Sequence, residues 1–149
     1  MVTIYFDTCC LNRPFDDQTQ YRIRVESETV LFILDQVKIG ELKCVGSEVL
    51  DLEIDLIPNL EQKRRVKLLA SHISNLIRIE QKEIKRAKQL ELLGFRLFDA
   101  LHIACAESGN IDILLTTDDK LLRLATRFSD KLSIQVKNPL KWLEEVSKK

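Results

Sequence analysis

The stretch DILLTTDD (residues 112–119) is a short apolar run that ends in two hydroxyls and two carboxylates. An apolar run of this length, bounded by turn residues, is typical of a strand buried on both faces of a sheet. The segment VTIYF (2–6) is rich in β-branched and aromatic residues, which favours the same kind of strand, and a carboxylate, Asp7, follows it directly. The two segments predict a buried sheet with polar residues at the ends of its strands.

Helical patterns separate the predicted strands along the chain. Strands are expected at 2–6, 42–45, 76–79, 112–117 and 133–136, and helices at 21–38, 47–57, 60–74, 81–93, 95–108, 119–128 and from Pro139 onward. The stretch 11–20 has the composition of a turn. Alternating strands and helices predict an α/β fold, namely a doubly wound α/β/α sandwich with a central parallel sheet. The length of 149 residues suggests a single domain, 1–149.

Composition narrows the class of protein. Lysine plus arginine and aspartate plus glutamate both count 23, so the net charge is zero, and any nucleic-acid binding must use locally concentrated positive charge or be transient. No apolar run is long enough to span a membrane, and the N-terminus lacks the features of a signal peptide. The four cysteines show no metal-binding spacing, which favours core residues in a reducing cytoplasm.

Four acids are distributed over the ends of predicted elements: Asp7, Glu53, Asp99 and Asp118. Ligands of an open parallel sheet bind beyond the carboxyl ends of its strands, so Asp7 and Asp118 share a crevice if their strands are neighbours. Isolated buried carboxylates are costly, but several can share an interior site with a cation. We therefore expect Mg²⁺ or Mn²⁺, held by Asp7, Asp99 and Asp118, with Glu53 as a further catalytic acid.

Two other acids compete for these roles. Glu48 lies five residues before Glu53 and directly behind Ser47, a predicted helix N-cap, so the helix dipole explains it more simply. Asp119 follows Asp118, and Asp118 is itself a favourable N-cap for the next helix. The sequence leaves Glu48 and Asp119 as possible additional site residues.

The strings DTCCLNRPFDD, SEVLDLE, FDALHIACAE and LLTTDDKLL together resemble the PIN domain family, in particular VapC-type toxins and their stand-alone relatives. The resemblance covers nearly the whole chain in the same order. It implies a Mg²⁺- or Mn²⁺-dependent endoribonuclease whose acids match Asp7, Glu53, Asp99 and Asp118 and whose hydroxyl positions match Thr8 and Thr116. The insert NRPFDDQ after the first motif is longer and more polar than the family pattern. It is either a loop that places Arg13 on a substrate phosphate or only a turn.

The resemblance also implies partners: RNA, a possible antitoxin protein and a second copy of the chain in a homodimer. The alternative function is a non-catalytic module that binds a metal or a basic peptide in the same crevice. A phosphoacceptor or haloacid-dehalogenase-like site is not supported, because Asp7 is followed by Thr8-Cys9 rather than by the required pattern. A basic cluster at 63–67 could contact RNA phosphates but is more simply a solvated helix face. His102, three residues after Asp99 on the same predicted helix, either hydrogen-bonds that carboxylate or is a surface or half-buried residue.

Overall fold

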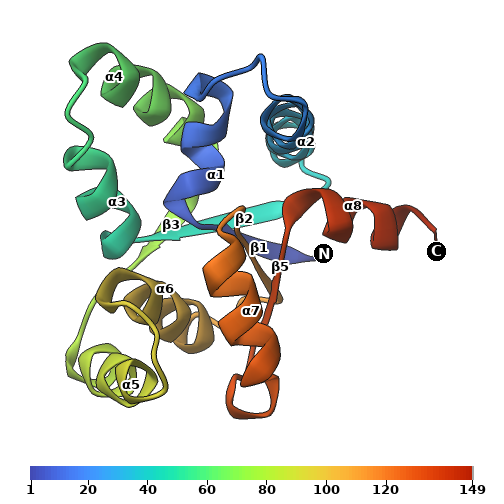
Figure 1. Cartoon of the computed structure of the whole chain (residues 1–149). Coiled ribbons are helices and arrows are strands. Elements are labelled where there is room, and N and C mark those ends of the chain that lie inside the picture. The colour runs from blue at the N-terminus through green and yellow to red at the C-terminus, as the bar shows by residue number, and fades with distance from the viewer. Residues whose placement is uncertain (149) are drawn as a thin grey trace.

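The computed structural model describes residues 1–148, Asn75 by its backbone alone. Strands and helices alternate along the chain (Figure 1). The strands are β1 (Thr3–Phe6), β2 (Lys43–Ser47), β3 (Ser74–Ile77), β4 (Ile113–Leu115) and β5 (Gln135–Lys137). The helices are α1 (Thr8–Asn12), α2 (Tyr21–Lys38), α3 (Glu48–Asp55), α4 (Leu60–Leu69), α5 (Gln81–Leu92), α6 (Leu97–Ser108), α7 (Asp119–Arg127) and α8 (Pro139–Ser147). Short 3₁₀ turns, η1 (Arg13–Phe15), η2 (Ala70–His72) and η3 (Ser129–Lys131), follow α1, α4 and α7.

The five strands form one parallel sheet in the order β3-β2-β1-β4-β5. The chain first builds outward from β1 to β3 and then returns to the other side of β1 to add β4 and β5. The strand order therefore reverses between β1 and β4, which is the place where ligands bind in open parallel sheets. The strands that precede Asp7 and Asp118 are therefore neighbours, which was the condition for these two acids to share a crevice.

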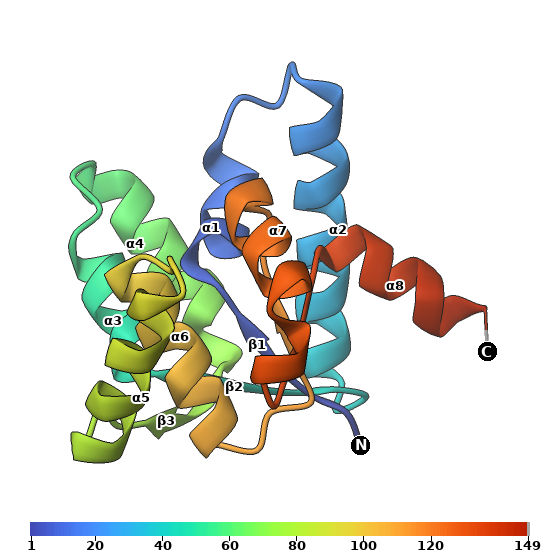
Figure 2. The same cartoon turned by 60° about the horizontal axis from the view of Figure 1, so that its bottom comes forward.

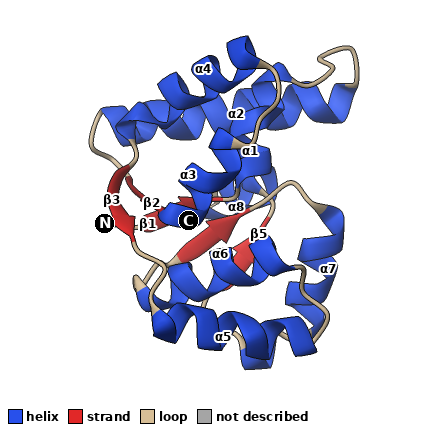
Figure 3. Ribbon diagram, turned by 90° about the vertical axis from the view of Figure 1, so that its left-hand side faces the viewer, coloured by secondary structure: helices blue, strands red, loops and turns tan. Residues whose placement is uncertain are grey.

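Each face of the sheet is covered by its own helices, as the three layers in Figure 3 show. Ile4 and Phe6 of β1 pack into a core with α1, α2, α3, α4 and α8, whereas Tyr5 packs into a second core with α5, α6 and α7. Leu114 of β4 joins the second core and its two neighbours join the first. Apolar residues on both faces of one strand are the physical reason for the predicted α/β/α sandwich, which is confirmed.

The segment at 11–20 differs from the expectation. Residues 8–12 form the helix α1, and Pro14 lies in the first turn of η1, where its missing N–H leaves no unsatisfied donor. The predicted helix at 60–74 ends at Leu69, because the chain must extend again at Ser74, which pairs with Val45 of β2. None of the described helices combines the length and apolar composition that a membrane crossing requires.

Candidate metal centre at the switch point

Asp7 lies at the carboxyl end of β1, where the strand order reverses. Its side chain is 5% exposed, and its backbone N–H donates to the Leu115 carbonyl of β4 at 2.9 Å. The Thr116 hydroxyl donates to Asp7 Oδ2 at 2.8 Å, and the Cys9 thiol donates to the same oxygen at 3.3 Å. A hydroxyl from the end of β4 and a thiol from α1 therefore fix this carboxylate in one orientation.

Glu53 reaches the same place from the last turns of α3. The Thr8 hydroxyl donates to Glu53 Oε1 at 2.8 Å, and His102 Nε2 is hydrogen-bonded to the same oxygen. Burial acts to raise the pKa of Glu53, but these bonds and the charge of His102 hold that pKa below its ordinary value. Glu53 is thus held ionised beside Asp7.

His102 is fully buried on α6 and joins the two carboxylates. Its Nε2 lies 3.6 Å from Asp7 Oδ1. An ionised carboxylate only accepts, so Nε2 carries the hydrogen in the bond to Glu53. Nδ1 is 2.5 Å from the Tyr5 hydroxyl, which is 2.5 Å from Ser47 Oγ. Burial acts to lower the pKa of His102, but the bond to Glu53 and the surrounding carboxylates raise it above its ordinary value.

Asp99 lies in the first turn of α6, one helical turn before His102. The pKa of its carboxyl is raised to about 6, first by burial and then by the negative charges of Asp7 and Asp118, while His102 opposes the rise. A carboxyl with so high a pKa lies in a region of surplus negative charge. Asp7, Asp99 and Asp118 are therefore close enough to interact electrostatically.

The remaining acids have other partners. Asp118 is the N-cap of α7, and its Oδ1 accepts from the backbone N–H groups of Lys120 (2.9 Å) and Leu121 (3.2 Å). Asp119 points instead to Arg22, which donates two bonds of 2.7 Å to it. Glu48 accepts from the Ile79 N–H at 2.8 Å. Glu53, rather than Glu48, lies beside Asp7.

Arg13 donates to two acids and not to the cluster around Asp7. Its Nε bonds to Glu26 at 2.9 Å and its Nη1 to Asp16 at 3.2 Å. The hydroxyls of Thr8 and Thr116 are both buried and both donate to carboxylates of the cluster. In this structure these three residues orient other side chains.

The arrangement fits a hard divalent cation. Among the described residues, ligand atoms of Asp7, Glu53 and His102 lie within 4.8 Å of one another. Carboxylate oxygens are the ligands preferred by Mg²⁺ and Mn²⁺. After burial, the negative charges of Asp7 and Asp118 contribute to the raised pKa of Asp99 at the same place. We call the set Asp7, Glu53, Asp99, His102 and Asp118 the acidic centre.

The sequence left two interpretations of His102, a hydrogen bond to the carboxylate of Asp99 or a surface or half-buried position, and the structure bonds it to Glu53. The available signal was its position three residues after Asp99, which puts both on one face of a helix. The sequence could not show that this face points to the ends of β1 and β4. That orientation depends on the contacts of α6 with the second core.

Comparisons with known proteins agree with this fold. The sequence model of the PIN domain matches residues 4–127. No curated protein matches the sequence. Among solved structures, VapBC-1 from nontypeable Haemophilus influenzae aligns with a TM-score of 0.60 and 16% identity, covering 94% of this chain and 99% of the other.

Two further structures are similar at the level of fold. VapBC2 from Rickettsia felis, solved with a DNA fragment from its promoter, gives a TM-score of 0.56 and 15% identity over 92% of this chain and 98% of the other. PAE2754 from Pyrobaculum aerophilum gives a TM-score of 0.55 and 14% identity, covering 99% of this chain and 91% of the other. At these identities the likeness establishes a common fold.

Proposed function

Because this chain belongs to the PIN domain family of nucleases, we propose that it is a Mg²⁺- or Mn²⁺-dependent endoribonuclease that hydrolyses phosphodiester bonds in RNA. The observation that carries the proposal is the convergence of Asp7, Glu53 and His102 within 4.8 Å, at the switch point of a parallel sheet. The raised pKa of Asp99 at the same place indicates surplus negative charge. This charge is what a divalent cation would neutralise.

Each residue of the acidic centre has a proposed role. Asp7, Asp99 and Asp118 would hold the cation, and Glu53 would complete the catalytic carboxylates. The cation, when bound, supplies a Lewis acid that activates water and stabilises the charge that develops on the phosphate. Thr116 and Thr8 orient Asp7 and Glu53 through hydrogen bonds of 2.8 Å each. His102, bonded to Glu53, keeps that carboxylate ionised at neutral pH.

We also propose that the enzyme is the toxin of a type II toxin–antitoxin pair. The support is that two of the similar structures are VapBC proteins and that each aligns over more than nine-tenths of this chain. An antitoxin protein is then the expected partner, with RNA as the substrate and a homodimer as the expected assembly. The four cysteines are free thiols, which is consistent with action in the reducing cytoplasm.

The test is cleavage of a labelled single-stranded RNA by purified protein, with Mn²⁺, with Mg²⁺ and with EDTA. Wild-type protein should cleave only with a metal. Asp7→Asn should lower the rate at least about a hundredfold, because a lost ligand removes several kcal/mol of transition-state stabilisation. Asp35→Asn, an exposed position on α2, is the matched control and should cleave normally.

Two results would contradict the proposal. Equal cleavage by the Asp7→Asn variant would show that the acidic centre is not the active site. Mn²⁺ binding by wild-type protein without hydrolysis of any RNA tested would instead support a non-catalytic module on the same fold.

A further inference from the structure

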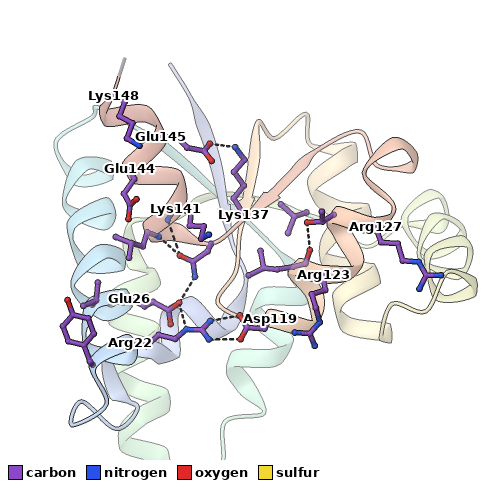
Figure 4. A pocket seen from close by; sticks show the side chains of 17 residues that line it. Arg22, Glu26, Asp119, Arg123, Arg127, Lys137, Lys141, Glu144, Glu145 and Lys148 are labelled. Atoms are coloured by element: carbon purple, nitrogen blue, oxygen red, sulfur yellow. Dashed lines mark hydrogen bonds and ion pairs between the residues drawn. The ribbon is translucent and has the colours of Figure 1, made fainter.

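A large groove lies beside the acidic centre, between α2, α7, β5 and α8. Its volume is about 1180 Å³, above the roughly 300–1,000 Å³ typical of pockets for small ligands. Figure 4 shows Lys141 and Lys148 on the α8 side, Arg123 on the α7 side, and Arg22 beside Asp119 where α2 and α7 approach each other. Figures 1 and 2 show that α8, which forms one side of the groove, extends away from the sheet toward the C-terminus.

The groove and the acidic centre share one turn of the chain. Arg22 Nη2 donates to the Thr117 carbonyl at 3.2 Å, and Arg22 also binds Asp119, which lines the groove. In the same turn, the Thr116 hydroxyl binds Asp7 and accepts from the Asp118 N–H at 3.1 Å. The groove also borders Lys137, the last residue of β5, so it opens at the same edge of the sheet as the centre. A polymer that crosses the centre can therefore continue along the groove.

The charges in the groove favour an anionic occupant. Most of its acids are already neutralised: Glu26 and Asp119 by Arg22, and Glu145 by Lys137. Glu144 is the remaining acid. Within the described part of the chain, four of the cations that line the groove form no ion pair: Arg123, Arg127, Lys141 and Lys148. The groove is therefore lined by four unpaired cations and one unpaired acid.

The apolar surface of the groove suits nucleobases. Val25, Leu122, Val136 and Leu140 line it, and Tyr21 lines it with 73% of its surface exposed. The Arg24 guanidinium lies 5.8 Å from the centre of the Tyr21 ring. Aromatic rings beside a cationic track are the usual means of holding single strands without regard to sequence, because every base has a stacking face.

On another basic surface of the protein, that of α4, the cations are already paired. Arg64 and Arg65 are both paired with Glu61, and Lys67 is paired with Asp55. Their charge is largely used within the protein. The α4 surface therefore serves as a comparison.

We propose that the groove between α2, α7 and α8 binds the backbone and bases of single-stranded RNA that leads away from the acidic centre. The proposal rests on the proposed function, because it assumes that RNA is the polymer cut there. It adds a binding track outside the centre, in which Arg123, Lys141 and Lys148 contact phosphates and Tyr21 stacks on a base.

The test measures binding apart from cleavage. Fluorescence anisotropy of a labelled single-stranded RNA of mixed sequence is followed in EDTA, with wild-type protein and the double variant Arg123→Glu/Lys141→Glu. The variant should bind at least about tenfold more weakly, and the slope of log K against log salt should fall by about 1.4, because two phosphate contacts are lost. Tyr21→Ala should weaken binding at least about fivefold through loss of stacking.

The matched control is Lys85→Glu/Lys88→Glu on α5, which makes the same change in net charge at exposed positions that do not line the groove. Circular dichroism and melting curves establish that each variant is folded, and Lys148→Glu gives a second, more peripheral test. Equal loss of binding in the control and groove variants would overturn the proposal. So would retained binding in the groove variants, or loss only when Arg64 and Arg65 are reversed.

Two outcomes separate this proposal from the proposed function. Groove-dependent RNA binding without metal-dependent cleavage would contradict only the nuclease activity. Metal-dependent cleavage with RNA binding unaffected by the groove variants would contradict only the track. A labelled polyglutamate peptide is the competing probe: if it binds the groove and RNA does not, the occupant is an acidic protein segment and the proposal is wrong.

Discussion

Two groups of buried carboxylates lie near the same edge of the sheet, and they are neutralised in different ways. Glu26 is 2% exposed and accepts from Arg13 (2.9 Å), Arg22 (3.3 Å) and the Asn138 amide (2.6 Å). Asp7 is 5% exposed and has Glu53 and His102 beside it, and among the described residues it forms no ion pair with a lysine or arginine. Glu26 is paired with arginines of the protein, whereas Asp7 lies beside another carboxylate.

This difference distinguishes an ion-pair network that stabilises the fold from a site that could bind a cation. A buried carboxylate that is bonded to two arginines is a closed ion-pair network that joins η1, α2 and the start of α8. A group of carboxylates without permanent cations carries a charge that burial disfavours, and the raised pKa of Asp99 records that penalty. Such a group indicates a site for a cation from solution.

The largest expected effect is on stability at Glu26. Glu26→Gln should lower the free energy of unfolding by about 3 kcal/mol, because Arg13 and Arg22 lose their buried partner. Asp7→Asn in metal-free protein should cost far less, since it removes an uncompensated charge. Denaturant unfolding measures both, with Glu28→Gln, an exposed position on the same helix, as the control. If Glu26→Gln lowered the free energy of unfolding less than Asp7→Asn does, the interpretation of Glu26 as the structural ion pair would be wrong.

Metal binding should stabilise one group only. Mn²⁺ at a hundred times its Kd should add about 2.7 kcal/mol to the stability of wild-type protein, because the folded state alone has the site. Glu26→Gln should keep this gain, and Asp7→Asn should lose it. Thermal melting with and without Mn²⁺ gives the result. The same gain in the Asp7→Asn variant would place the cation elsewhere.

The pKa of Asp99 should depend on Asp7. Asp7→Asn removes a neighbouring negative charge, so the pKa of Asp99 should fall from about 6 toward its ordinary value. A raised pKa in the folded state contributes stability that is present below about pH 4 and lost as pH rises through about 6. The stability gap between variant and wild type should therefore change with pH across this window.

Titration of the side-chain carboxyl carbon by NMR reads this pKa directly. Glu26→Gln serves as the control and should leave the value unchanged. An unchanged pKa in the Asp7→Asn variant would mean that burial alone raises it.

The smallest effect is expected at the ion pair between Arg22 and Asp119, which links the Glu26 network to the residue that follows Asp118. Arg22 and Asp119 are each about half exposed, so Asp119→Asn should lower stability by less than about 1 kcal/mol. A double-mutant cycle with Arg22→Gln isolates the pair. A coupling of several kcal/mol would show that the two groups act as one network rather than two.

The sequence by itself determined the layers of this protein and the first members of its site. Unbroken apolar runs at 4–6 and 113–115 require helices on both faces, and a parallel sheet puts Asp7 and Thr116 at one edge. Strand direction and side-chain alternation are local properties, so these predictions could be made without contacts.

Only the tertiary structure decided which partners the other polar side chains bind. It brought His102 to Glu53 across 49 positions, bonded Glu48 to Ile79, and paired Arg13 with Glu26 and Asp119 with Arg22. It also formed the groove, whose walls come from α2, α7 and α8. The physical reason is that a helix's rotation and position are set by packing against the sheet. A sequence pattern gives the apolar face of a helix but not which distant residue its polar face will meet.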